Sequence, residues 1–158
     1  MSTQNLTQLL DKMWVDYTAI NPLAQKIYDV LTAQGETLSN DHIALRTFNH
    51  PRINIEVLAR PFLAWGYKEM GDYQFPEKKL YAKHYQHSDP KMPKIFISEL
   101  KLEEFSQALR ETVNSLVNQI PANAETANDF TSIGRPWNVS TATYDALLKE
   151  SDYAAWVA

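Results

Sequence analysis

The chain has 158 residues, about the length of one ordinary domain, and its 44% hydrophobic and 22% charged content is typical of a soluble globular protein. Its 19 acidic and 15 basic residues give a net charge of −4, which argues against a general binder of nucleic acids or anionic membranes. The absence of cysteine excludes disulfides, thiolate metal sites and cysteine nucleophiles. The sequence has neither a signal peptide nor an apolar run of the roughly 20 residues that span a bilayer. We therefore expect one cytoplasmic domain over residues 1–158.

The first segment, residues 1–38, is predicted to be helical. Apolar residues recur at helical spacing over 5–17 and predict one amphipathic helix. A second helix should follow, with Asn21 as its cap, Pro22 in its first turn and Gly35 just beyond its end. Since each helix has a one-sided apolar stripe, we expect the two to pack together.

The pattern changes to strand-like alternation in the second segment, residues 39–100. The predicted elements are, in chain order, a strand at 41–48, a helix at 53–65, and strands at 67–73, 79–86 and 94–100. Pro61 implies a kink in this helix or a late start. The order is β-α-β-β-β, which predicts a module with one four-stranded curved sheet.

The third segment, residues 101–158, is predicted to be a helical extension. A helical repeat of apolar residues covers 102–120, and a polar connection follows over 121–137. Two short helices should cover 143–150 and 152–157, the second capped by Ser151. The predicted fold class is therefore α+β, with two N-terminal helices, one β-α-β-β-β module and a helical C-terminal third.

Two polar residues on the first predicted strand are candidates for chemistry. His42 could present a neutral imidazole to a metal, or it could be a half-buried histidine bonded to the backbone. Arg46 would share its face, roughly 13 Å along the strand. Its planar guanidinium suits bidentate capture of a carboxylate, and the alternative is a structural ion pair with a neighbouring acid.

Other candidates are weaker. Glu99 could be a metal ligand, although a glutamate at a sheet edge facing water is the simpler interpretation. His84 and His87 should point to opposite faces of their strand and are therefore poor partners for one metal. The four tryptophans fit core and interface anchors better than a ligand cage. Phosphate-binding glycine loops and the common hydrolase motifs are absent from the sequence.

Four stretches of the sequence carry a resemblance to a known family. They are NDHIALRTF at 40–48, FPEKKLYA at 75–82, IFISEL at 95–100, and the pattern W-x-x-Y-x-x-I-N-P at 14–22. Together they resemble the 2-oxoadipate dioxygenase/decarboxylase family, also called hydroxyglutarate synthases, of the vicinal-oxygen-chelate type. The resemblance covers most of the chain and is most specific at 40–48.

This resemblance implies a non-haem iron(II) enzyme in which two β-α-β-β-β modules surround one metal. Two histidines and a glutamate hold the iron in such a site and leave positions for a 2-oxo acid and dioxygen. The reaction oxidatively decarboxylates 2-oxoadipate to a 2-hydroxy acid in lysine breakdown. By position, His42 resembles the first histidine ligand, and Arg46 resembles the arginine that holds a substrate carboxylate.

The resemblance extends only to the N-terminal portion of the family, because the second module and its two ligands are absent from this sequence. We therefore expect a truncated chain that binds iron weakly or not at all and is inactive alone. The alternative is a non-catalytic small-ligand-binding or dimerising module with the same fold. We expect a small 2-oxo acid and dioxygen as partners, no nucleic acid or membrane, and possible homodimers through the exposed sheet face. The sequence leaves open which 2-oxo acid is bound, which metal, and the oligomeric state.

Overall fold

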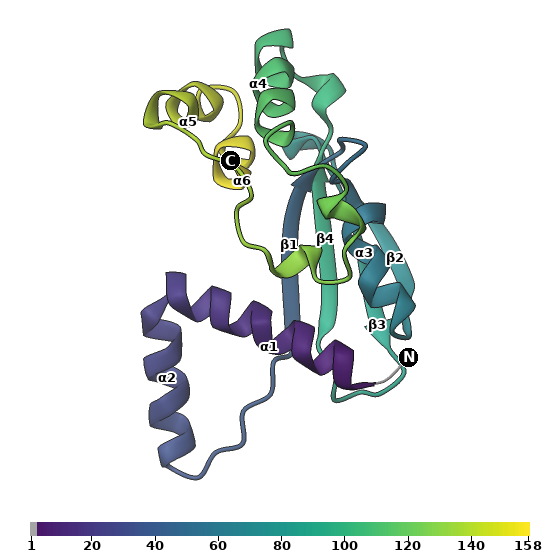
Figure 1. The fold of residues 1–158 in the computed structure, drawn as a ribbon, viewed down its shortest axis with the longest axis vertical. Coiled ribbons are helices and arrows are strands. Elements are labelled where there is room, and N and C mark those ends of the chain that lie inside the picture. Colours follow the sequence, from purple (N-terminus) through teal and green to yellow (C-terminus); the bar gives the residue numbers. More distant parts are fainter. Residues whose placement is uncertain (1–2) are drawn as a thin grey trace.

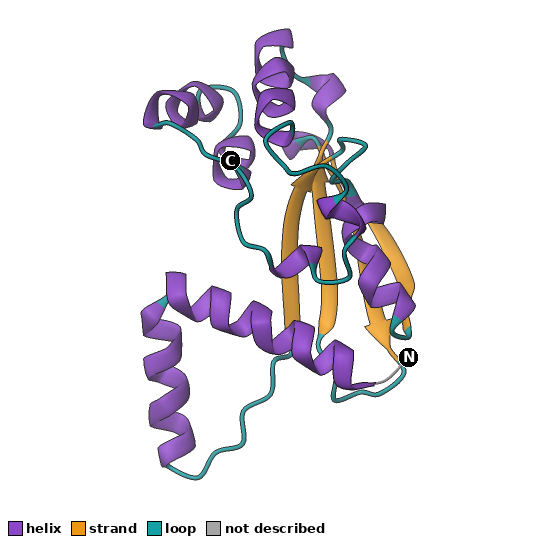
Figure 2. Cartoon of the chain, in the orientation of Figure 1, coloured by secondary structure: helices purple, strands orange, loops and turns teal. Residues whose placement is uncertain are grey.

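The structure, a computed structural model, describes residues 3–158 as an α+β fold around one four-stranded sheet (Figures 1 and 2). The helices are α1 (Thr3–Ile20), α2 (Pro22–Ala33), α3 (Ile55–Ala64), α4 (Gln107–Val117), α5 (Thr141–Leu148) and α6 (Asp152–Val157). The strands are β1 (His42–Phe48), β2 (Tyr67–Phe75), β3 (Leu80–His87) and β4 (Lys94–Leu100). The predicted fold class is confirmed. Residues 1–2, at the start of the expected helical segment, lie outside the described residues.

The strands are arranged in the order β1-β4-β3-β2, so the last strand of the module lies beside the first. β1 and β4 run parallel, whereas β4 with β3 and β3 with β2 are antiparallel. In the register of β1 and β4, Arg46 lies opposite Ser98 and Thr47 lies opposite Glu99. Because neighbouring partners point to the same side of a sheet, Arg46 and Ser98 share one face, and Thr47 and Glu99 share the other.

α3 covers the face that carries Thr47 and Glu99. The Thr47 hydroxyl donates to the carbonyl of Ile53, and the Glu99 carboxylate accepts from the Ile55 amide at 2.9 Å. Fully buried side chains on the central strands complete this side of the core, and they include Tyr85, Ile95 and Ile97. The two contacts fix the start of α3 against the end of the sheet.

The opposite face is covered only near the end of β1. Here α6 lies beside the strand (Figure 1), and Phe48 is fully buried. Nearer the start of the strand, His42, Ala44 and Arg46 are exposed. This change of cover along one strand positions the candidate site at its uncovered part.

The N-terminal helices pack less closely than their apolar stripes predict. α2 extends away from the sheet (Figure 1), and it has no buried residue. Leu23, Ile27 and Val30 are each more than half exposed on it. Trp14 and Tyr28 still bring α1 and α2 together, with ring centres 5.5 Å apart.

Several element boundaries differ from the predicted ones. The helix expected over 102–120 begins only at Gln107, because Ser106 is its cap and its hydroxyl accepts from the Leu109 amide at 3.1 Å. Pro61 lies inside α3, so the alternative of a late helix start is wrong. Asn21 precedes α2 without capping it through its side chain.

The connection predicted to be polar over 121–137 also contains buried aromatic side chains, Phe130 and Trp137. Within residues 3–158, no helix has the length and the apolar content that crossing a membrane requires.

Candidate functional site

β1 places His42 and Arg46 on the uncovered face, beside a hollow of about 620 Å³ between the N-terminal helices and the sheet. Alternation along the strand turns both side chains to the same side. The walls of the hollow are largely apolar and include Trp14, Tyr17, Ile20 and Ile27. The structure therefore brings the two predicted site residues to one cavity, four residues apart on one face of β1.

His42 is more open than either sequence interpretation implies. Its side chain is 66% exposed, and its Nδ1 lies 3.1 Å from Oδ2 of Asp41. Since a carboxylate only accepts hydrogen bonds, Nδ1 is the donor in this pair. In the neutral ring this leaves a lone pair on Nε2, which is the arrangement of a metal-binding histidine supported by a carboxylate. The expectation of a half-buried histidine bonded to the backbone is wrong.

Arg46 has an aromatic neighbour in place of the acid that a structural ion pair would need. Its Cζ lies 4.0 Å from the ring centre of Trp156 on α6. The guanidinium makes no hydrogen bond or ion pair with any other residue of the described chain, 3–158. Its donors are therefore available to an anion. Trp156 was expected as a core or interface anchor, and nothing local in the sequence places α6 beside β1.

A buried tyrosine holds α6 on the sheet. The Tyr153 hydroxyl donates to the carbonyl of Ser98 at 2.8 Å, and it also lies 2.9 Å from the Ser98 hydroxyl. The Thr47 amide donates to the Tyr153 hydroxyl oxygen at 3.3 Å. Burial raises the pKa of Tyr153 to about 12, so the hydroxyl stays protonated at neutral pH. This network joins α6 to both β1 and β4 next to Arg46.

A second hollow of about 500 Å³ adjoins the first at the edge of β1. Arg46 and Asp16 line both hollows, whereas Trp156 and Arg135 line only the second. Arg46 thus stands between the two, with one further positive and one negative side chain nearby.

Glu99 takes no part in this site. It lies on β4, an internal strand, with its carboxylate on the face covered by α3. Burial raises the pKa of Glu99 above its ordinary value, and the hydrogen bond from Ile55 opposes that rise. The expectation of an edge glutamate facing water is therefore wrong.

The other strand histidines are also separate from His42. Nδ1 of His84 lies 2.9 Å from the Tyr73 hydroxyl, and Nε2 of His87 lies 3.1 Å from the carbonyl of Trp65. Residues 3–158 contain no group of three His, Cys, Asp or Glu side chains that could hold a metal ion. Residues 3–158 therefore do not by themselves fit an iron(II) site with three protein donors. They offer His42 as one donor for such a site.

Comparison with known proteins assigns the chain to a family. Residues 3–129 match the family model of 2-oxoadipate dioxygenase/decarboxylase. The chain belongs to this family. It is 27% identical to the chloroplastic 2-oxoadipate dioxygenase/decarboxylase of Arabidopsis thaliana, over 94% of this chain and 44% of that protein. The resemblance inferred from the four sequence stretches is confirmed.

Solved structures show the same relationship. The hydroxyglutarate synthase of Oryza sativa, in complex with 2-oxoadipate, is 28% identical with a TM-score of 0.87, over 97% of this chain and 53% of that one. A putative hydrolase from Shewanella frigidimarina NCIMB 400 is 50% identical with a TM-score of 0.89, over 96% of this chain and 59% of that one. The chain thus spans about half the length of the proteins it matches.

Proposed function

We propose that this chain contributes His42 and Arg46 to the site of a non-haem iron(II) enzyme that oxidatively decarboxylates a 2-oxo acid to a 2-hydroxy acid. The observation that carries the proposal is that a histidine with a free Nε2 and an arginine with no acidic partner lie on one strand face beside one cavity. The family supports 2-oxoadipate as the substrate, since a relative is described in complex with it. We place the reaction in lysine breakdown, in the cytoplasm.

The two residues have different roles in this proposal. Arg46 presents a planar fork of N–H donors that matches a carboxylate of the 2-oxo acid. His42 offers one nitrogen donor, with Asp41 orienting the ring from the other side. In this proposal a further protein segment or a second molecule supplies the remaining donors for iron, so no chemical step is assigned to this chain alone.

The rival function is a non-catalytic module that binds a small acid or dimerises through the uncovered sheet face. It is favoured by the absence, within residues 3–158, of a group of three side chains that could hold a metal ion. Such a module would bind 2-oxoadipate equally well with and without Fe(II). It would also form dimers in analytical ultracentrifugation at the concentrations where it binds the acid.

Calorimetric titration of the chain with 2-oxoadipate, under anaerobic conditions and with or without Fe(II), tests the binding role. A bidentate charged contact is worth roughly 1.5–3 kcal/mol, so Arg46→Ala should weaken binding about tenfold to a hundredfold. Arg46→Lys should recover only part of the binding affinity, because an ammonium keeps the positive charge but lacks the planar pair of N–H donors. The matched control is Arg110→Ala, which removes an exposed arginine of α4 far from the cavity. Equal loss in both alanine variants would contradict the proposal.

Oxygen uptake with 2-oxoadipate and Fe(II) tests the catalytic role. We expect no turnover from this chain alone, because residues 3–158 bring no three metal-binding side chains together. In any longer natural form, His42→Ala should abolish turnover, and Arg46→Ala should raise the Michaelis constant without unfolding the protein. Turnover that both variants leave intact would overturn the assignment of the two residues.

A further inference from the structure

The contact between Arg46 and Trp156 involves the flat face of the guanidinium and, within residues 3–158, leaves its N–H edge free. The indole ring lies against it at 4.0 Å from Cζ, a distance at which a cation is attracted to the face of the ring. A carboxylate pairs instead with the N–H groups at the edge of the guanidinium, in its plane. The two interactions are therefore compatible, and Arg46 can keep its aromatic neighbour while it binds an acid.

The helix that carries Trp156 is held firmly at its start. Ser151 caps α6 by accepting from the Ala154 amide at 3.1 Å, and Tyr153 anchors the first turn on Ser98. Trp156 itself is 67% exposed, so core packing does not account for its large side chain. A rigid helix thus presents an exposed indole to the one arginine that lines both hollows.

We propose that Trp156 is a positioning residue for Arg46, and that it holds the guanidinium in the orientation that receives a carboxylate of the 2-oxo acid. This inference rests on the proposed function of Arg46. A free arginine loses much rotamer freedom when it binds a ligand, and that loss weakens binding. Stacking on Trp156 restricts Arg46 before the acid arrives, so less freedom is lost at the binding step.

Calorimetric titration with 2-oxoadipate of the chain and its Trp156 variants tests the inference. Trp156→Leu keeps an apolar side chain but removes the ring, and it should weaken binding on the order of three- to tenfold. Trp156→Phe keeps a ring face and should restore most of the affinity. Tyr144→Leu is the matched control, since it removes an exposed aromatic side chain from neighbouring α5 away from both hollows, and it should change nothing.

A spectroscopic measurement reports the stack itself. In a proton–nitrogen correlation spectrum of the arginine side chains, the Nε–H proton of Arg46 should be shifted by the ring current of the indole. Trp156→Leu should abolish this shift and Trp156→Phe should keep part of it. If Trp156 had a purely structural role, the affinity of Trp156→Phe would not follow the ring-current shift that this variant keeps.

The possible outcomes separate the two proposals. If Trp156→Leu binds as tightly as the parent while Arg46→Ala loses affinity, the positioning role is overturned and the function of Arg46 stands. If Arg46→Ala itself loses no affinity, the proposed function fails and the inference with it. If the leucine variant is unstable, the phenylalanine variant decides, because affinity that falls while the ring-current shift persists would overturn the role of stacking.

Discussion

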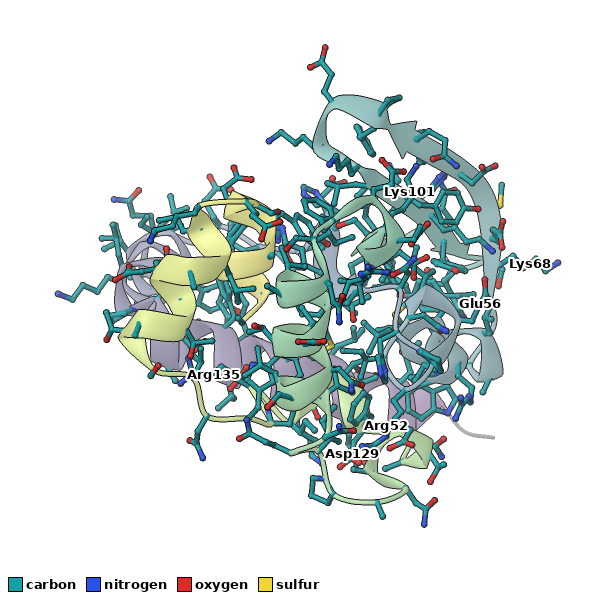
Figure 3. All side chains as sticks on the ribbon, turned by 90° about the horizontal axis from the view of Figure 1, so that it is seen from above. Arg52, Glu56, Lys68, Lys101, Asp129 and Arg135 are labelled. Carbon is teal, nitrogen blue, oxygen red and sulfur yellow. The ribbon has the colours of Figure 1, made fainter. Side chains whose placement is uncertain are left out.

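Two arginines near the end of β1 have opposite surroundings. Arg52, in the loop that leads to α3, donates two hydrogen bonds to the Glu125 carboxylate, from Nη2 to Oε2 at 2.7 Å and from Nε to Oε1 at 3.1 Å. Its remaining donors reach the backbone carbonyls of Val117, Ile120 and Pro121. Figure 3 shows Arg52 among the side chains between α3 and the segment after α4. Within residues 3–158, Arg46 has no such hydrogen-bonded partners, and the face of the Trp156 indole lies against it.

Arg52 stabilises the fold, whereas the donors of Arg46 are free to bind a ligand. The carboxylate beside Arg52 raises its pKa further, and the guanidinium lowers the pKa of Glu125. These donors tie the loop before α3 to the end of α4 and the turn after it, where the carbonyls of Val117 and Pro121 also accept from the backbone amides of Ile120 and Ala124. At Arg46 the same side chain is fixed by stacking alone, so its hydrogen-bonding capacity remains for a ligand.

Substitution of Arg52 should reduce stability more than any other change considered below. Arg52→Ala removes the guanidinium partner of the Glu125 carboxylate and the Arg52 hydrogen bonds to three carbonyls, two of which keep a backbone donor, and it should lower the free energy of unfolding by about 2–3 kcal/mol. Urea denaturation followed by circular dichroism measures this. Arg46→Ala should cost less than about 1 kcal/mol, because it loses only the stack on Trp156. Equal losses in the two variants would show that the surroundings do not separate the two arginines.

A smaller loss is expected from Tyr153→Phe. This change removes one buried hydroxyl and leaves the Ser98 hydroxyl without its partner, which should cost about 1–2 kcal/mol. The helix α6 would then be held less firmly, so 2-oxoadipate binding should weaken together with stability. The same urea experiment and titration check both. A variant with parental stability would show that Tyr153 does not anchor α6.

The ion pairs of Lys83 should contribute less again. Lys83 lies on the covered face with a side chain that is 15% exposed, and it bonds Glu56 at 2.6 Å and Glu69 at 3.0 Å. Lys83→Met should lower the free energy of unfolding by about 1 kcal/mol, because both carboxylates are well exposed and regain water. The control is Lys68→Met on neighbouring β2, an exposed position (Figure 3), where no change is expected.

Local patterns in the sequence predicted most of the fold. The order of helices and strands along the chain over residues 39–100 and the cap at Ser151 were both predicted correctly, because alternation and capping depend on residues close in the chain. The start of α4 was placed too early, since apolar periodicity continues through residues 102–106 while Ser106 interrupts the helix. The exposure of α2 was missed because an amphipathic stripe predicts a partner without showing that one is present.

The candidate site was predicted only in part. His42 and Arg46 were recognised from one strand segment, whose alternation places them on one face. Trp156 and Tyr153 were missed as neighbours of that strand, because docking of α6 depends on contacts between residues far apart in the sequence. Glu99 was misplaced at an edge, because the sequence alone does not show that β4 lies between β1 and β3.

Two carboxylates, Glu99 and Glu125, should make the stability depend on pH in opposite directions, with a smaller effect than the substitutions above. Burial raises the pKa of Glu99, so the folded state binds its proton more tightly than the unfolded chain does. Its contribution to stability is therefore full below the ordinary glutamate pKa and falls as pH rises through the raised one. Glu99→Gln keeps an acceptor for the Ile55 amide and has no charge to bury. It should gain stability relative to the parent as pH rises from about 4 to 7.

Glu125→Gln should behave in the opposite way. Arg52 lowers the pKa of Glu125, so this carboxylate stabilises the fold above its ordinary pKa and loses that contribution as pH falls through the lowered one. The glutamine variant should therefore be less stable than the parent at pH 7 and approach it in acid. Urea midpoints of both variants at several pH values give the two slopes. Slopes of the same sign would mean that one of the two carboxylates does not have the surroundings described here, because burial and ion pairing shift a carboxylate pKa in opposite directions.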